Sequence, residues 1–254
     1  MASATDPGLK RQFNEDSVAI DPAFNLMVLA DGMGGYQGGE LASGIATSII
    51  ASELRNARAS DWEGITERAI AAADERIREA GTDDPRYAEM GTTVVLAWLA
   101  EDDCMIVAHV GDSRAYRLRE GRLEQLTKDH AFLQEQVEQG TITREEARNS
   151  RSRHLVTRAL GTEQAAADVR SIEVKPGDVF LLCSDGLHDT VDRPQIELAL
   201  NSLHANLPLA AKILVHMAND NGGYDNISVV LAKVGPPRRT GLLQGMLDWV
   251  KLRA

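Results

Sequence analysis

Several features that define other protein classes are scarce in this chain of 254 residues. Its two cysteines, Cys104 and Cys183, each lie inside an apolar run and lack the CxxC or CxxH spacing of metal motifs. A disulfide scaffold is therefore excluded, and we expect two buried thiols in a reducing compartment. No apolar run approaches the ~18 residues of a membrane span, and the N-terminal segment carries charges instead of a signal-peptide core. We therefore expect a cytoplasmic protein with no membrane span.

Basic residues are too few and too scattered for a nucleic-acid binder. The chain has 27 Lys and Arg against 38 Asp and Glu, a formal net charge of −11. Phosphate contacts along a nucleic acid need a dense basic face, which is missing. With 43% hydrophobic and 26% charged residues, the composition is that of an ordinary globular protein. The acidic balance is compatible with a site built from carboxylates.

Apolar patterning predicts an α+β fold with antiparallel sheets. Short apolar segments separated by turn residues predict strands, and stretches with apolar residues at helical spacing predict helices. The strands are expected at 17–20, 26–30, 92–100, 105–110, 114–119, 123–126, 169–174, 179–183 and 227–234. The helices are expected at 39–58, from 62 to a closing Gly81, at 129–140 with a second piece at 144–148, and at 195–203 and 209–218. Hairpin-linked strands in blocks favour this class over a βαβ alternation.

Two segments lack a clear place in that pattern. Residues 149–168 are rich in Arg, Ser and Thr, and we expect most of them to be a mobile surface segment. The run Pro236-Pro237-Arg238-Arg239 marks a boundary between a domain at 1–235 and a tail at 236–254. Apolar residues in that tail form a broad stripe, for which packing on the chain's own domain is favoured over a partner or membrane surface.

The aspartates fall where apolar strands end. Asp31 follows the run LMVLA, Asp112 follows IVAHVG, Asp185 follows VFLLCS, and Asp225 directly precedes the last predicted strand. A carboxylate at the edge of a core is costly unless it is paired or bound to a metal. Several carboxylates that converge would repel one another, and a multivalent cation resolves this. Oxygen ligands alone select Mg²⁺ or Mn²⁺ over Zn²⁺.

Several other catalytic chemistries have no support in the sequence. A cysteine phosphatase needs Arg six positions after its Cys, where this chain has Val110 and Asp189. The HExxH, GxSxG and GxxxxGK[ST] motifs are absent from the sequence. The histidines show no ligand-like spacing, and His109, inside a strand run, is expected to be a hydrogen-bonded core residue.

Seven short motifs occur in one order along the chain. They are Arg11-Gln-Phe-Asn-Glu15-Asp16, Asp31-Gly-Met-Gly-Gly35, Gly91-Thr-Thr93, His109-Val-Gly-Asp-Ser-Arg-Ala-Tyr116, Leu126-Thr-Lys-Asp-His130, Ser184-Asp-Gly-Leu-His-Asp189 and Gly222-Gly-Tyr-Asp-Asn226. This order resembles the metal-dependent serine/threonine protein phosphatases of the type 2C family, in their compact bacterial form. The resemblance covers about residues 8–234. It implies a four-layer α-β-β-α sandwich, in which two central antiparallel sheets are flanked by helices.

The resemblance also implies a role for particular residues. Asp31 would bridge two metals with help from the carbonyl of Gly32, and Asp185 and Asp225 would complete the ligands of the second metal. The other implied roles are water-mediated contact with the first metal for Glu15 and Asp16, a third metal site for Asp112 with Asp185, substrate phosphate binding for Arg11, and support of the ligands for Asp189 and Asn226.

The implied reaction is hydrolysis of phosphoserine and phosphothreonine in proteins, opposing a Ser/Thr kinase. Two Mg²⁺ or Mn²⁺ ions, with a third expected, would activate a water that attacks phosphorus without a covalent enzyme intermediate. Some family members have His where this chain has Met33, and that His is proposed as the general acid. Met33 cannot donate a proton, so a metal-bound water or another residue must do so.

Two functional alternatives to this reaction follow from these residues. A catalytically silent binding module with this fold would usually lose metal carboxylates, whereas Asp31, Asp112, Asp185 and Asp225 are all present. A phosphatase for small phosphate esters also fits an accessible cleft. Residues 131–165 resemble a flap beside the active site, and whether its arginines face phosphopeptides or only solvent is left open. We expect a monomer with phosphoprotein substrates.

Overall fold

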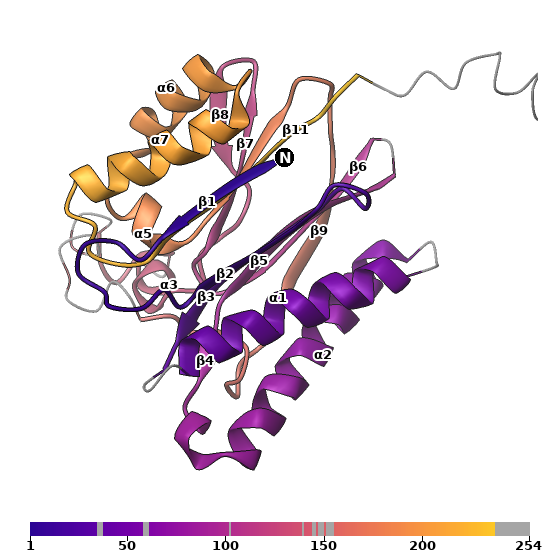
Figure 1. Cartoon of the computed structure of the whole chain (residues 1–254), viewed down its shortest axis with the longest axis vertical. Helices are drawn as coiled ribbons and strands as arrows, with labels where there is room; N and C mark the ends of the chain where they lie inside the picture. The colour runs from indigo at the N-terminus through magenta and orange to yellow at the C-terminus, as the bar shows by residue number, and fades with distance from the viewer. Residues whose placement is uncertain are drawn as a thin grey trace, which may run out of the picture.

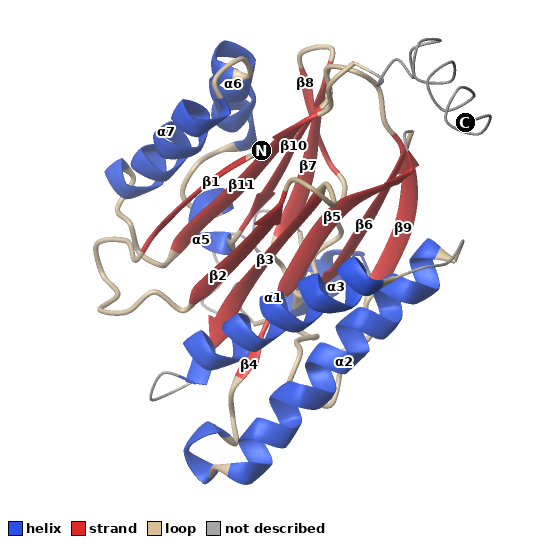
Figure 2. Cartoon of the chain, turned by 45° about the vertical axis from the view of Figure 1, so that its right-hand side comes forward, coloured by secondary structure: helices blue, strands red, loops and turns tan. Residues whose placement is uncertain are grey.

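The computed structural model contains two antiparallel β-sheets that face each other, with helices on the outer side of each sheet (Figure 1). The structure describes residues 1–34, 38–57, 61–101, 103–138, 140–143, 146, 150 and 155–236. Figure 2 shows the strands between the two helical layers. The four-layer α-β-β-α sandwich that the sequence predicts is confirmed.

Each sheet is a continuous set of hydrogen-bonded neighbours. The first sheet has the order β1-β11-β10-β7-β8, with β1 (Ala2–Asp6), β7 (Arg114–Arg119), β8 (Arg122–Gln125), β10 (Val179–Cys183) and β11 (Ile227–Lys233). The second has the order β2-β3-β5-β6-β9, with β2 (Asp16–Asp21), β3 (Leu26–Met33), β5 (Val94–Glu101), β6 (Cys104–Val110) and β9 (Asp168–Glu173), and β4 (Gly91–Thr92) also pairs with β3.

The helices divide between the two outer faces. Buried residues of α1 (Gly38–Asn56) and α2 (Trp62–Asp83) pack on the second sheet, and the short η1 (Pro85–Tyr87) follows α2. Buried residues of α5 (Asp185–His188), α6 (Arg193–Leu203) and α7 (Leu207–Asp220) pack on the first sheet. The remaining described helix, α3 (Phe132–Glu138), follows β8 along the chain. No described helix combines the length and apolar character that a membrane span requires.

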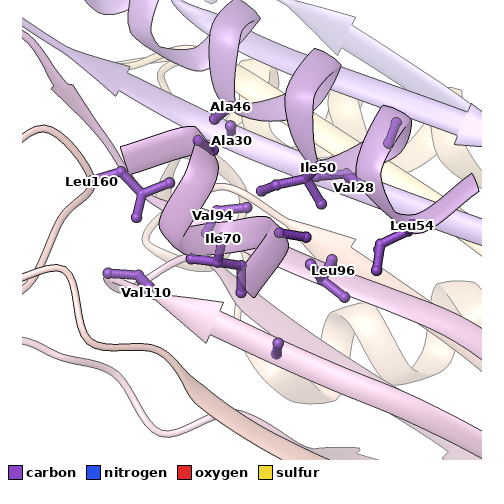
Figure 3. Packing of buried hydrophobic residues seen from close by; sticks show 14 of the residues in the cluster. Val28, Ala30, Ala46, Ile50, Leu54, Ile70, Val94, Leu96, Val110 and Leu160 are labelled. Carbon is purple, nitrogen blue, oxygen red and sulfur yellow. The ribbon is translucent and has the colours of Figure 1, made fainter. Parts of the chain in front are cut away.

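Strand β3 shows why its sequence is apolar without alternation. Successive side chains of a strand point to opposite faces. Val28 therefore packs with Ile50 of α1 and Ile70 of α2 (Figure 3), whereas Leu29 packs with Phe180 of the other sheet. Both faces are buried, and the strand delivers the residue that follows its apolar run, Asp31, to a fixed position.

Strand β1 and helix α2 are among the elements that differ from the sequence-based prediction. Strand β1 was not predicted because its sequence, ASATD, has no apolar alternation, and it pairs only with β11 at the edge of its sheet. Helix α2 does not close at Gly81 but continues to Asp83. A Cβ atom at Gly81 would lie 3.0 Å from the carbonyl oxygen of Tyr87, so this glycine lets the chain after the helix fold back tightly.

In the segment 149–168, most of which is expected to be a mobile surface, Leu160 belongs to the core. Leu160 is fully buried, and its backbone exchanges two hydrogen bonds with Thr92 at 2.9 and 3.1 Å. Most of the predicted helical piece at 144–148, residues 151–154 and the tail after Pro236 lie outside the described residues. Cys183 is buried as expected, whereas Cys104 is only partly buried.

Candidate metal centre

The aspartates predicted from the strand ends come together in space, and Asp16 joins them. Burial raises the pKa of Asp31 well above its usual range. The negative charges of Asp16, Asp185, Asp112 and Asp225 raise this pKa further, so each of them lies near Asp31. Carboxylates that raise the pKa of a buried neighbour in this way call for positive charge beside it.

Asp16 is the carboxylate of the cluster whose hydrogen bonding is incomplete. It lies directly opposite Asp31 in the pairing of β2 with β3. Burial raises its pKa to about 7, although the hydroxyl groups of Ser228 and Ser184 lower it. Its Oδ2 accepts a hydrogen bond of 2.9 Å from Ser184 Oγ. Within the described part of the chain, its buried Oδ1 has no hydrogen-bond partner, and such an atom calls for a cation or an ordered water.

Asp112 and Asp185 form a second acidic pair. Asp112 is 8% exposed, and burial, followed by the charge of Asp185, raises its pKa to about 7. Asp112 follows Gly111, whose φ of +101° belongs to the left-handed region. Asp185 is the first residue of α5, and the next residue, Gly186, lies so close to β11 that a Cβ atom there would be 2.1 Å from the carbonyl oxygen of Asn226. Both aspartates are therefore fixed by the backbone beside them.

Gly32 and Glu15 meet at the start of α1. The amide of Gly32 donates to the carbonyl of Glu15 at 3.2 Å. A Cβ atom on Gly32 would lie 2.1 Å from the carbonyl oxygen of Gly39, so only glycine fits. Burial raises the pKa of Glu15, and the nearby charge of Arg11 opposes this. The Glu15 carboxylate also accepts from the amide of Gly39, in the first turn of α1, where the helix end favours negative charge.

Asn226 fastens the N-terminal loop to the start of β11. Its Oδ1 accepts from the amide of Glu15 at 2.8 Å. Its Nδ2 donates to the carbonyls of Pro7 and Phe13, at 3.0 and 2.8 Å. Its own amide donates to Oδ1 of Asp225 at 2.9 Å. The predicted supporting residue therefore orients the loop that carries Arg11 and Glu15.

Arg11 lies at the edge of the cluster, next to open space. Its Nη2 donates to Oδ2 of Asp225 at 2.8 Å, and the side chain is 53% exposed. A pocket of about 570 Å³ adjoins it, lined by Arg11, Gln12, Phe13, Glu15, Gly34, Arg86 and Tyr87. The guanidinium group is thus held by one carboxylate and faces a space that a peptide could enter.

Two further predicted residues have less defined surroundings. Asp189 caps α5, where its amide donates to the carbonyl of Asp185 at 2.9 Å and its carboxylate lies 3.3 Å from Nδ1 of His188. Met33 ends β3 opposite Gly91. Its thioether has no proton to donate, as the sequence indicates.

The sequence analysis assigned no role to three hydroxyl residues that hold the cluster. Thr92 Oγ1 donates to the carbonyl of Asp31 at 2.8 Å, and Thr93 Oγ1 accepts from the amide of Asp31 at 3.2 Å. Ser184, which binds Asp16, is the third. Each stands in one of the seven motifs, so its position was visible, but its hydrogen-bond partner is distant in sequence.

The chemistry of this donor set suits hard cations. Its side-chain donors are carboxylate oxygens, supplemented by the carbonyl of Gly32, and no His or Cys belongs to the set. Oxygen donors favour Mg²⁺ and Mn²⁺. A divalent cation would also supply the positive charge that the raised pKa values of Asp16, Asp31 and Asp112 call for.

Comparison with known proteins identifies the family of this chain. The chain belongs to the protein phosphatase 2C family, whose profile matches residues 9–226. Serine/threonine protein phosphatase PstP of Mycobacterium tuberculosis is 38% identical over 233 residues, which are 92% of this chain and 44% of PstP. The chain therefore spans less than half the length of that relative.

Other relatives match over nearly their whole length. Serine/threonine phosphatase stp of Listeria monocytogenes is 34% identical over 247 residues, covering 90% of this chain and 93% of that protein. A crystal structure of the catalytic domain of PstP in complex with 2 manganese ions superposes with a TM-score of 0.84 at 36% identity. That match covers 92% of this chain and 97% of the other. The resemblance given by the seven motifs is confirmed.

Proposed function

We propose that this chain hydrolyses phosphoserine and phosphothreonine in proteins, with two divalent cations at the carboxylate cluster. Asp31, with help from the carbonyl of Gly32, would bridge the two cations. Asp185 and Asp225 would complete the protein ligands of one of these cations. Glu15 and Asp16 would act on the other through water. A third cation would lie between Asp112 and Asp185.

The buried Oδ1 of Asp16 is the observation that carries this proposal. A carboxylate oxygen that is buried without a partner, on the residue directly opposite Asp31, calls for a cation or an ordered water to satisfy it. The relative PstP has been crystallised with manganese, and its catalytic domain shares this fold. Bound Mg²⁺ or Mn²⁺ would lower the pKa of water and polarise the phosphoryl group.

The chain's own residues would orient the substrate. Arg11 presents a planar guanidinium group that can take two phosphate oxygens. Asp225 holds this group in place through a single nitrogen, Nη2, at 2.8 Å. Asn226 and Gly32 keep the loop and strand that carry Arg11 and Glu15 at fixed positions. The adjoining pocket gives room for residues next to the phosphorylated side chain.

Several coarser expectations are part of the same proposal. The catalytic unit would be residues 1–235, monomeric and cytoplasmic, and it would oppose a Ser/Thr kinase. Residues 131–165 would form a flap beside the site, anchored in the domain at Leu160, which is fully buried. The tail at 236–254 would pack on this domain.

The test compares substrates and metals in one assay. A phosphothreonine peptide and a phosphorylated metabolite are each incubated with Mn²⁺, with Mg²⁺ and with EDTA. The proposal predicts metal-dependent turnover with a higher kcat/KM for the peptide. Turnover of the metabolite alone would indicate a small-ester phosphatase. A folded, metal-loaded chain without turnover of either substrate would indicate a silent binding module.

A further inference from the structure

Two buried histidines stack on each other beside the Asp112 strand end. The ring centroids of His109 and His130 are 4.5 Å apart and their planes differ by 17°. His109 lies in β6, and its Nε2 is 2.7 Å from the carbonyl oxygen of Lys128. His130 belongs to the segment between β8 and α3, and its backbone carbonyl accepts from the amide of Thr157 at 2.8 Å. The pair therefore lies at the start of the proposed flap, in contact with Thr157 in its second half.

This pair could be mistaken for a metal site. Ligand atoms of His109, His130 and Asp168 all lie within 4.8 Å of one another. The amide of Gly111, however, donates to Nδ1 of His130 at 3.2 Å, which uses the lone pair of that nitrogen. A neutral imidazole then carries its proton on Nε2, which lies 3.3 Å from Oδ2 of Asp168. Neither nitrogen of His130 has a free lone pair for a cation.

Arg158 strengthens this conclusion. Its Nη1 lies 3.0 Å from Oδ1 of Asp168 and 3.3 Å from Nε2 of His130. A permanent positive charge thus occupies the position that a cation would need. Burial lowers the pKa of His130, which keeps the ring neutral near pH 7. Asp168 is thus within hydrogen-bond reach of both His130 and Arg158, and the positive charge of Arg158 balances its negative charge.

His130 holds the residue before Asp112 from both sides. Its backbone amide donates to the carbonyl of Gly111 at 2.9 Å, while its Nδ1 accepts from the amide of Gly111. Gly111 has a φ of +101°, and a Cβ atom there would lie 2.6 Å from Cγ2 of Thr93. These contacts fix the turn that directs Asp112 toward the carboxylate cluster.

We propose that His130, at the base of the flap, is a positioning residue that holds Asp112 in place. Its Nδ1 would hold the Gly111 amide so that Asp112 is presented for metal binding, and its Nε2–H would donate to Asp168, which also accepts from Arg158. This inference rests on the proposed metal-dependent function. Groups that orient metal ligands from behind typically change metal affinity by about 10–100-fold when they are lost.

Two substitutions separate the two sides of the ring. His130→Asn places an amide oxygen near the position of Nδ1 and keeps the acceptor for Gly111, but loses the contact with Asp168. His130→Gln places its amide nitrogen near Nε2 and keeps a donor for Asp168, but loses that acceptor. His109→Gln is the control, because it is a neighbour of similar burial that can still donate to Lys128.

The measurement is calorimetric Mn²⁺ binding to the metal-free full chain, without substrate, together with the Tm of each variant. His130→Gln is expected to weaken the weakest Mn²⁺ site by about tenfold, while His130→Asn and His109→Gln stay near wild type. Equal weakening by both His130 variants would show a packing role only and overturn the proposal. Unchanged affinity in His130→Gln would overturn it as well.

An NMR measurement on the wild type keeps the inference testable if a variant does not fold. The ¹⁵N shifts of the His130 ring should report a neutral ring with its proton on Nε2, with or without Mn²⁺. A proton on Nδ1, or direct metal ligation of the ring, would contradict the proposal. A wild-type chain that neither binds Mn²⁺ nor hydrolyses phosphopeptides would instead overturn the proposed function, so the two failures are distinguishable.

Discussion

Asp16 and Asp31 lie directly opposite each other on the neighbouring antiparallel strands β2 and β3. Like charges in this position destabilise a sheet by up to about 1 kcal/mol. Burial raises the pKa of both groups, so the metal-free fold holds them at a cost. The site therefore lowers the stability of the sheet when no metal is bound, and a bound cation removes this repulsion.

Asp31→Asn should therefore stabilise the metal-free protein while it abolishes activity. We expect the Tm in EDTA to rise by about 2–4 °C, which corresponds to about 1 kcal/mol in a domain of this size. Turnover with Mn²⁺ should fall by at least about a hundredfold. Thermal unfolding and a phosphopeptide assay check the two halves.

Asp178→Asn is the matched control. Asp178 is 2% exposed and accepts hydrogen bonds of 2.8 and 2.6 Å from Arg119. Here the negative charge is paired, so its removal should lower the Tm and leave turnover unchanged. A lower Tm in EDTA for both variants would contradict the account of the acidic cluster.

The stability of the metal-free protein should fall as the pH rises from about 4 to about 7. Burial raises the pKa of Asp16 and of Asp112 from about 3.8 to about 7. Between these values the folded state binds more protons than the unfolded state, so a rise in pH favours unfolding. The loss of stability is complete above the pKa of the folded state and absent below the pKa of the unfolded state.

Urea unfolding in EDTA across this pH range measures the effect. Mn²⁺ should reverse the trend, because cation binding requires the deprotonated carboxylates. Metal-free stability that increases steadily up to about pH 7 would show that the cluster is solvated and not buried.

Arg11→Ala should weaken phosphopeptide turnover without loss of metal binding. A hydrogen bond to a charged group contributes about 1.5–3 kcal/mol, so kcat/KM should fall by about 10–100-fold. Arg11→Lys should recover only part of this, since an ammonium group cannot bind two phosphate oxygens in one plane. Lys10→Ala, one residue away, is the control. Equal effects at the two positions would remove the specific role of Arg11.

Leu160→Ala tests whether the end of the proposed flap is part of the core. Leu160 is fully buried, whereas Leu155 is 56% exposed. The buried substitution should cost about 2–5 kcal/mol of unfolding free energy, from lost transfer energy and a cavity. Leu155→Ala should stay within about 0.5 kcal/mol of wild type. Chemical denaturation gives both values, and a similar small loss for the two would return the segment to the mobile surface.

The fold was largely predictable because most of its strands are marked by apolar runs in their own sequence. The apolar runs that became β3, β5, β6 and β10 are long and dense, and turn residues mark their ends. Strand β1 was not predicted because its sequence has no apolar pattern. It forms a strand by pairing with β11, which lies more than 200 residues away in the sequence. Helix α2 passes through Gly81 because tertiary packing there outweighs the helix-breaking tendency of glycine.

The sequence predicted the candidate metal ligands of the site, but not the hydrogen bonds that hold them in place. Asp31 and Asp185 stand at strand ends, where position along the chain already indicates a shared location. The bond from Ser184 to Asp16 spans 168 positions, and that from Asn226 to Glu15 spans 211. Such pairs depend on how the sheets pack, and neither apolar periodicity nor motif spacing encodes that. The stacking of His109 on His130 is a further case, since their spacing along the chain gives no sign of it.

The most direct test of the central claim is hydrolysis of a phosphothreonine peptide by wild type and Asp185→Asn, after EDTA treatment and again after Mn²⁺ is restored. The account predicts that wild-type activity disappears in EDTA and returns with Mn²⁺, while the folded variant stays inactive in both. Activity that survives EDTA, or a fully active Asp185→Asn, would contradict a reaction carried out at the carboxylate cluster.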